Sequence, residues 1–291
     1  MEPGFLAIAL ITLAAAFVNG ALGYGFSSLT VPVGLLFFAN RVLNPALVLI
    51  EVVVNSYALF INRRSVPRIW KRTLPILAGL VPGVVIGSFL LSAVNPGIMK
   101  LLTYAVLLPL ILLQASGFRR YIRAERAIGA PLGTGIGVLY SVTTISGPPL
   151  ALMLNNQGFV REDFRASLAL IRIAESTLTA IAYAFLGLYS VQTGSLVGLI
   201  APSVIVGVPL GAYLIRRLAA ETFRRICMSF DAWVVGFGFS RTLLDLGILG
   251  DPSAYVVLAT AASIDLVLLY QFFTRRQRGE LAFEAVAPSS H

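Results

Sequence analysis

Long apolar segments separated by short arginine-rich stretches are the feature that most constrains this chain. From Phe5 to Phe273, nearly every stretch of about 20 residues lacks charge, and the basic residues fall between the stretches. A bilayer core requires roughly 20 apolar residues per helical crossing, and a helix satisfies its own backbone hydrogen bonds there. The short alternating segments of a membrane β-barrel are missing from the sequence. The pattern therefore predicts an all-α membrane protein.

The composition predicts one membrane domain over residues 1–291 and no enzyme. The chain is 57% hydrophobic and 12% charged, whereas about 25% of residues are charged in soluble chains. We attribute most of the net charge of +9 to arginines in cytoplasmic loops, so no nucleic-acid partner is expected. His291 is the only histidine and Cys227 the only cysteine, and the sequence has no Walker A motif. These absences argue against a metal site, a disulfide, a hydrolase or a cofactor.

Two of the apolar segments are longer than a single straight crossing requires. The segments run over 5–38, 45–62, 73–92, 97–116, 127–157, 164–187, 192–215, 222–246 and 253–273. A straight helix over 5–38 would measure about 51 Å, well beyond a hydrocarbon core of about 30 Å. Helix-poor residues interrupt both long segments, at 19–28 and at 141–149. Each long segment is predicted either to re-enter as a broken hairpin or to cross once.

The distribution of basic residues favours hairpins. The loops 62–72, 117–126, 158–165, 216–225 and 274–278 contain 5, 4, 2, 4 and 3 Lys or Arg residues, 18 of the 22 in the chain. If both long segments are hairpins, all five loops face the same side, which the positive-inside rule makes cytoplasmic. If each long segment crossed once, these charges would be divided evenly between the two sides of the membrane. We therefore predict about seven full crossings in an inner membrane, with the N-terminus outside and the C-terminus cytoplasmic.

The order of features repeats at an offset of 120 to 124 residues. Residues 44–56 resemble 164–176, and the small-residue row at 79, 83 and 87 matches the row at 203, 207 and 211. We predict that the rows allow close helix approach. A hairpin followed by three crossings forces the second copy to be inverted, as in many secondary transporters. The predicted units are about 5–120 and 127–246, followed by an extra helix at 253–273 and a tail at 274–291.

The two interruptions form the first candidate site. Irregular backbone at membrane depth occurs where it lines a protein cavity or water. Ser27 or Ser28 is predicted to cap one half-helix, and Ser146 or Gly147 the other, with Pro148 in its first turn. The helix N-termini would then present amide groups to an anion. The alternative is that glycine and proline only permit packing or a kink.

Ionisable residues within the predicted spans add to this site. Arg172 and Glu175 lie one turn apart and could partly neutralise each other, while Glu51 shares a helix face with Asn55. Guanidinium suits an oxyanion, and a carboxyl group can carry a coupling proton. A purely structural Arg–Glu pair remains the alternative. Asp231 and Asp265 are weaker candidates for lining a pathway.

The glycine-rich interruption followed by Val31 and Pro32, and its partner at 146–149, resemble the TauE/SafE sulfite exporter family, also called toluene sulfonate uptake permeases. The resemblance covers roughly residues 10–246 and implies transport of sulfite, sulfonates or similar oxyanions. The first element departs from the usual consecutive glycines, since it reads Gly-Tyr-Gly-Phe-Ser at 23–27. The second has a serine before Gly147 where a double glycine is common.

These observations together predict a secondary transporter for a small anion, with sulfite or an organosulfonate as the favoured substrate. The predicted substrate-binding residues are Gly25, Ser27, Ser28, Asn55, Thr144, Ser146, Gly147, Arg172 and Ser176, with Glu51 and Glu175 as proton-coupling residues. The expected partners are the anion and membrane lipid, and a homodimer is left open. The alternatives are a permease for another metabolite or a metal ion, and a membrane scaffold or assembly protein that transports nothing.

Overall fold

The computed structural model describes residues 3–116, 125–155, 161–214 and 220–286, and their regular structure is entirely helical. The α-helices are α1 (Pro3–Leu22), α2 (Phe26–Gly34), α3 (Asn40–Asn62), α4 (Val66–Ala93), α5 (Pro96–Ala115), α6 (Glu125–Thr143), α7 (Gly147–Asn155), α8 (Arg161–Phe185), α9 (Val191–Leu214), α10 (Ala220–Asp245) and α11 (Val256–Val286). Two short 3₁₀ turns, η1 (Arg63–Ser65) and η3 (Ser253–Tyr255), precede α4 and α11. The predicted all-α class is therefore confirmed.

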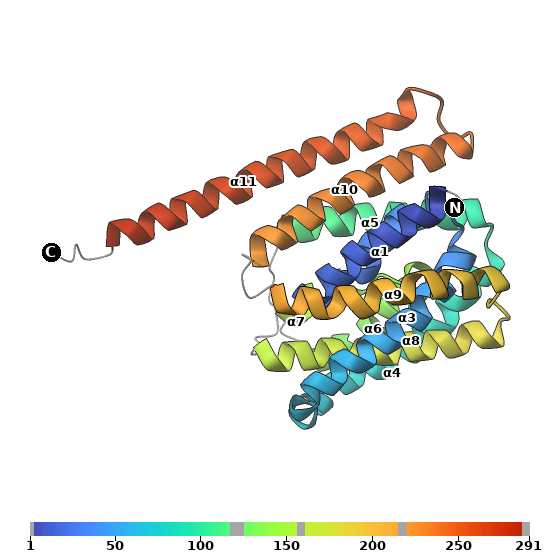
Figure 1. The fold of residues 1–291 in the computed structure, drawn as a ribbon, viewed down its shortest axis with the longest axis horizontal. Coiled ribbons are helices and arrows are strands. Elements are labelled where there is room, and N and C mark those ends of the chain that lie inside the picture. The colour runs from blue at the N-terminus through green and yellow to red at the C-terminus, as the bar shows by residue number, and fades with distance from the viewer. Residues whose placement is uncertain (1–2, 117–124, 156–160, 215–219, 287–291) are drawn as a thin grey trace.

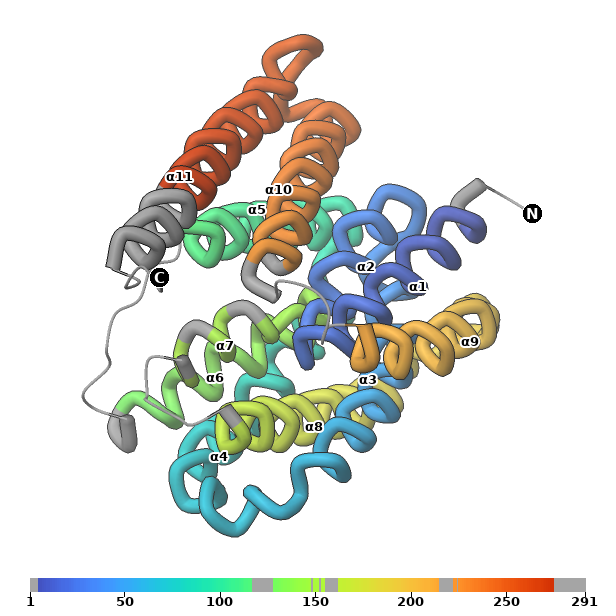
Figure 2. The backbone as a smooth tube through the Cα atoms, turned by 60° about the vertical axis from the view of Figure 1, so that its left-hand side comes forward, coloured from blue at the N-terminus to red at the C-terminus, as the bar shows by residue number. Residues whose placement is uncertain are grey.

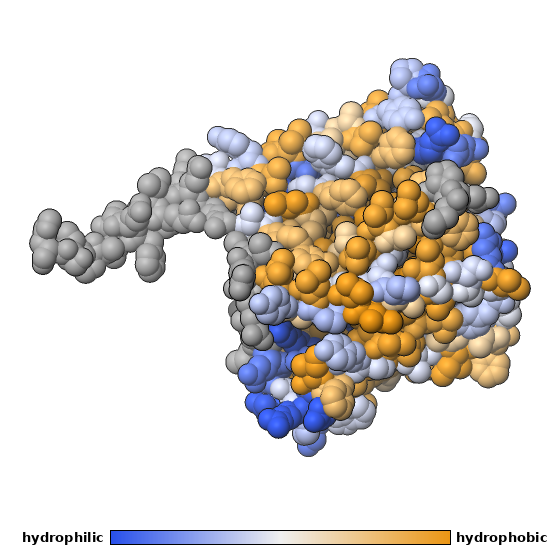
Figure 3. Space-filling view, in the orientation of Figure 1, coloured by the Kyte–Doolittle hydropathy of each residue, from blue (hydrophilic) through white to orange (hydrophobic). Residues whose placement is uncertain are grey.

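Six stretches of the described residues are long and apolar enough to cross a membrane. They lie in α1, in α3 and α4 together, and in α5, α8, α9 and the first part of α11. This set differs from the seven predicted crossings, because it includes α1, merges α3 with α4 and omits α10. α10 contains Arg225, Asp231 and Arg241, which lower its hydropathy. Figure 3 shows apolar residues over much of the middle of one face, with the most polar residues towards its two ends.

The first long segment folds back on itself as a helical hairpin. α1 ends at Leu22, and the shorter α2 begins at Phe26 after a turn that contains two glycines of positive φ. The rings of Phe5, at the start of α1, and Phe38, just beyond α2, pack edge to face with centroids 5.7 Å apart. The chain thus leaves the hairpin at the end of the bundle where it entered.

The second long segment turns back in the same way. α6 runs along α4, and α7 returns so that Leu154 packs in a cluster with Ile76 near the start of α4. α8 then begins at that same end, where Asp163 lies 4.0 Å from the guanidinium of the exposed Arg68. Figure 1 shows the two long segments entering the bundle from opposite ends. Both segments are therefore hairpins.

Each hairpin packs against the glycine-containing helix of the other half of the chain. α4 packs along α6, and α9 packs along α1. A Cβ on Gly83 of α4 would lie 2.2 Å from the carbonyl oxygen of Thr134, and one on Gly211 of α9 would lie 1.9 Å from that of Phe17. Glycine at these positions lets the backbones touch, as the small-residue rows predict. This reciprocal packing is what an inverted repeat requires, although the unit boundaries stay a prediction.

The remaining helices complete the bundle around a central pair. α3 and α8 pack against each other between the two hairpins, and α5 packs against α10. Figure 2 shows α5, α10 and α11 on one side and α4 and α8 on the other. The two helix breaks are consequently enclosed near the middle of the bundle.

Candidate transport site

The breaks of the two hairpins meet inside the bundle. Gly23 and Gly25 have φ angles of 83° and 107°, which suit glycine, whereas Thr144 has a φ of 57°, which is unusual for a side chain branched at Cβ. A Cβ on Gly147, the first residue of α7, would lie 3.3 Å from Cβ of Tyr24. The first turn of α7 therefore touches the break between α1 and α2.

Neither Ser27 nor Ser28 caps α2, so that prediction is wrong, whereas Ser146 immediately precedes α7 and its carbonyl accepts the amide of Leu150, as expected at an N-cap position. Gly25 is the N-cap residue of α2 and makes no side-chain cap bond. The Ser27 hydroxyl donates to Oε1 of Glu51 at 2.6 Å, and Ser28 donates to the carbonyl of Gly25 at 3.1 Å. The Ser146 hydroxyl donates to Oε1 of Glu175. The buried carboxylates compete successfully for these hydroxyls because charge-assisted hydrogen bonds are the stronger ones.

Glu51 of α3 connects three elements at the centre. Its side chain is fully buried. Oε1 accepts hydrogen bonds from Ser27 of α2 and from Nη2 of Arg172 on α8, the latter at 2.9 Å. Oε2 accepts the phenol hydroxyl of Tyr140 on α6 at 2.7 Å. A single carboxylate thus connects both hairpins to the central pair of helices.

Arg172 pairs across helices rather than along its own. A salt bridge joins its Nη2 to Glu51, although the sequence suggested Glu175, one turn away, as the neutralising partner. Nη1 makes only long contacts of 3.5 Å to the side-chain oxygen of Asn19 and to the carbonyl of Gly23. Nε is buried and has no hydrogen-bond partner within the described part of the chain. The guanidinium therefore retains unused donor capacity.

Glu175 occupies a second buried carboxyl site, next to the break before α7. It is fully buried, and the Ser146 hydroxyl donates to its Oε1. Oε2 finds no partner among the described residues. One buried guanidinium, on Arg172, thus faces two buried carboxyl groups at the centre, and only Glu51 is ion-paired with it.

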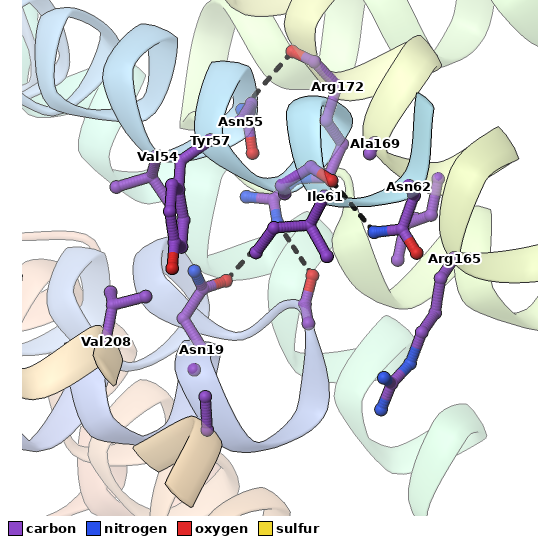
Figure 4. Close-up of a pocket in the computed structure, with 15 residues that line it drawn as sticks. Asn19, Val54, Asn55, Tyr57, Ile61, Asn62, Arg165, Ala169, Arg172 and Val208 are labelled. Atoms are coloured by element: carbon purple, nitrogen blue, oxygen red, sulfur yellow. Dashed lines mark hydrogen bonds between the residues drawn. The ribbon is translucent and has the colours of Figure 1, made fainter. Parts of the chain in front are cut away.

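A pocket of about 360 Å³ leads from one end of the bundle to Arg172. Asn62 at the end of α3 and the exposed Arg165 near the start of α8 lie at its mouth, while Asn19 and Asn55 lie beside Arg172 at its inner end. Figure 4 shows Asn19 below the Arg172 guanidinium, with Asn55 bonded to the Arg172 backbone carbonyl. The mouth lies at the end of the bundle where Arg63, Arg64 and Arg68 gather.

The sequence of the chain matches a known protein family over most of its length. A family model described as "Sulfite exporter TauE/SafE" matches residues 8–237. The chain belongs to the TauE/SafE family. The match extends from α1 into α10, so α11 lies outside it. Searches among curated proteins and among solved structures find no match. The family consists of membrane transporters, and its name refers to sulfite export.

Some of the predicted site residues of this TauE/SafE protein line the pocket, and the others do not. Asn55 and Arg172 line the pocket. The other predicted residues lie behind or beside them and are buried within the breaks and the central helices: Gly25, Ser27, Ser28, Thr144, Ser146, Gly147, Ser176, Glu51 and Glu175. Ser176 accepts a weak hydrogen bond of 3.5 Å from Asn55, and Thr144 donates to the Thr143 carbonyl. The binding and coupling roles of all these residues stay predictions.

Sequence reasoning missed two polar residues of this TauE/SafE site. Asn19 lines the pocket at the end of α1, and Tyr140 binds Glu51 from the end of α6. The two residues are 121 positions apart, as are the ends of α1 and α6 at Leu22 and Thr143. Comparing polar residues at that offset would have singled out both.

The two weaker candidates lie in a separate part of the molecule. Asp265 of α11 forms a buried salt bridge of 2.9 Å with Arg225 of α10 and accepts the indole N–H of Trp233. These bonds attach α11 to α10. Asp231 is buried in α10, and its Oδ1 lacks a hydrogen-bond partner among the residues described. The described residues include no group of three His, Cys, Asp or Glu residues arranged to hold a metal ion.

Proposed function

We propose that this TauE/SafE protein transports a small sulfur oxyanion, either sulfite or an organosulfonate, and binds it at Arg172. The main support is the incomplete hydrogen bonding of this arginine, whose Nε lacks a partner in the described chain and whose Nη1 contacts are long. A buried cation inside a membrane is costly and commonly marks a substrate path. Guanidinium presents parallel N–H donors that match two oxygens of an oxyanion.

The walls of the pocket suit a small polar anion. The amide side chains of Asn19 and Asn55 lie next to the guanidinium and can turn N–H groups towards bound oxygens. The volume of about 360 Å³ lies near the lower end of the range for small-molecule sites, roughly 300 to 1,000 Å³. The N-terminus of α2, which begins at Phe26, adds a positive helix-dipole end close to Gly23 of the pocket.

The pocket also has a proposed orientation in the membrane. Because the pocket opens at the arginine-rich end, the positive-inside rule makes this the cytoplasmic end of an inner-membrane protein. Deeper along α3, Glu51 is fully buried, so this conformation offers the anion access from the cytoplasm. Release on the other side would follow when one repeat rocks against the other, with the helix breaks near the pivot.

Reconstitution tests the proposed activity directly. Proteoliposomes containing the purified protein should accumulate radiolabelled sulfite faster than protein-free liposomes, and a short-chain sulfonate such as taurine should compete. Flux of other anions without flux of either sulfur compound would assign a different permease substrate. The absence of any flux from folded protein would contradict transport and favour a scaffold.

We expect proton coupling through Glu51 or Glu175, because an anion next to Arg172 would otherwise share one cation with two carboxylates. Protonating one carboxyl group as the anion binds removes this repulsion. Glu175→Gln retains the shape of the side chain and a partner for Ser146. It should preserve exchange of sulfite between compartments but reduce pH-driven accumulation by about tenfold, or about 1.4 kcal/mol.

The pH dependence of the same assay distinguishes the two carboxyl groups. Glu51→Gln also removes the partner of Arg172, so both exchange and accumulation should fall. If both variants retain uphill transport with an unchanged pH profile, neither residue carries the coupling proton. Arg241→Gln, at an exposed position on α10, serves as the control for a loss of charge away from the site.

A further inference from the structure

A second cavity, of about 350 Å³, lies between α4, α5 and α6, away from Arg172. Its lining residues are Leu90, Val94, Met99, Leu102, Val106, Gly135, Val138, Leu139, Val142 and Thr143. Leu102 and Val106 are 47% and 42% exposed, so the cavity opens on the outer surface of the helices. In a protein whose helices span the membrane, this surface contacts the hydrocarbon chains of the lipids.

The chemistry of the cavity excludes a polar ligand. Among the described residues that line it, Thr143 alone has a polar side chain, and its hydroxyl donates to the carbonyl of Leu139 at 2.7 Å while accepting the amide of Ile145. Every other lining side chain is apolar, apart from Gly135, which has none. Empty apolar space of this size forfeits dispersion contacts, so an apolar occupant would be favoured.

The place that the repeat relates to this cavity, between α1 and α10, is filled by aromatic rings. Phe17 of α1 and Phe223 of α10 pack edge to face with centroids 5.9 Å apart. α6 ends 121 residues after α1, and α10 starts 124 residues after α5, so these rings correspond to Val138 and Met99. Both smaller residues line the cavity. The cavity thus exists because the aromatic pair between α1 and α10 has no counterpart between α5 and α6.

We propose that an acyl chain of a membrane phospholipid occupies this cavity. The cavity is continuous with the lipid-facing surface and, at about 30 Å³ per water-sized group, has room for on the order of ten methylene groups. The α4–α5 connection lies next to its rim, where the Arg41 guanidinium binds the carbonyls of Leu91, Ser92 and Val94. A chain inserted here would leave its headgroup at this polar edge.

The glycines of the chain provide a matched test. A Cβ on Gly135 would meet nothing within 4 Å, so Gly135→Leu can fill the cavity without a backbone clash. Gly198 of α9 has the same open surroundings and does not line the cavity, so Gly198→Leu is the control. Wild type and the two variants are extracted in a mild detergent, and native mass spectrometry counts the phospholipids that remain bound. We expect wild type and Gly198→Leu to retain one phospholipid more per chain than Gly135→Leu.

A photoactivatable phospholipid with its reactive group on the acyl chain locates the contact. Labelled peptides should come from 99–106 and 135–143 in wild type, and Gly135→Leu should lose this labelling while keeping its melting temperature. Equal lipid retention and labelling in all three folded proteins would overturn the proposal. A dimer mass that Gly135→Leu alone abolishes would also overturn it, because a second copy would then cover the cavity. Neither measurement depends on transport activity.

Discussion

Replacing Arg172 with alanine is expected to abolish anion transport, with uptake into proteoliposomes falling by at least about 100-fold, or about 2.7 kcal/mol. The substitution removes the buried cation at the inner end of the pocket, and its guanidinium has no substitute among the residues that line it there. It also leaves Glu51 as a buried carboxylate without its salt-bridge partner. Breaking such a pair by removing one member costs about 3 to 5 kcal/mol of folding stability.

Further variants separate loss of transport from loss of folding. Arg172→Lys keeps the charge but loses the planar donor pair, so it should fold and show much weaker uptake. Arg172→Gln combined with Glu51→Gln removes both charges and should regain stability without regaining transport. Arg241→Ala, which changes an exposed arginine of α10, should match wild type. Normal sulfite uptake by stable Arg172→Ala protein would refute the proposed binding site.

Substituting alanine for Gly83 is expected to destabilise the bundle by several kcal/mol, because the new Cβ would lie 2.2 Å from the carbonyl oxygen of Thr134. The new Cβ would meet backbone atoms of Thr134, so the clash cannot be relieved by rotating a side chain. Overpacking typically costs about 1 to 3 kcal/mol and more where the backbone must move. α4 and α6 would have to separate, which would shift the break that follows α6.

Thermal unfolding in detergent, followed by size-exclusion chromatography, measures this effect. Gly83→Ala should melt at a clearly lower temperature than wild type and yield less monodisperse protein. Gly198→Ala is the matched control, since a Cβ there meets nothing within 4 Å and both glycines lie in apolar helices. Equal melting temperatures for the two variants would show that α4 and α6 tolerate greater separation than their packing indicates.

The pattern of apolar and basic residues determined the architecture before any tertiary contact was known. A segment of 34 apolar residues with a glycine-rich centre exceeds the thickness of the membrane, so it had to turn back or tilt strongly. Arginine counts predict the side of the membrane that each loop faces, because charge controls insertion locally. Small residues spaced four apart likewise indicated close helix contacts, and Gly83 and Gly211 lie in such contacts.

The partners of individual polar groups were decided only by the tertiary structure. Spacing along α8 suggested that Arg172 would pair with Glu175, yet Arg172 binds Glu51, which is 121 residues away. Ser27 and Ser146 were plausible helix caps by sequence, but packing brings a buried carboxyl group within reach of each hydroxyl. Local sequence specifies helices and breaks because their energetics are local, whereas the pairing of buried charges depends on which helix faces which. The reciprocal packing of the two halves determines that arrangement.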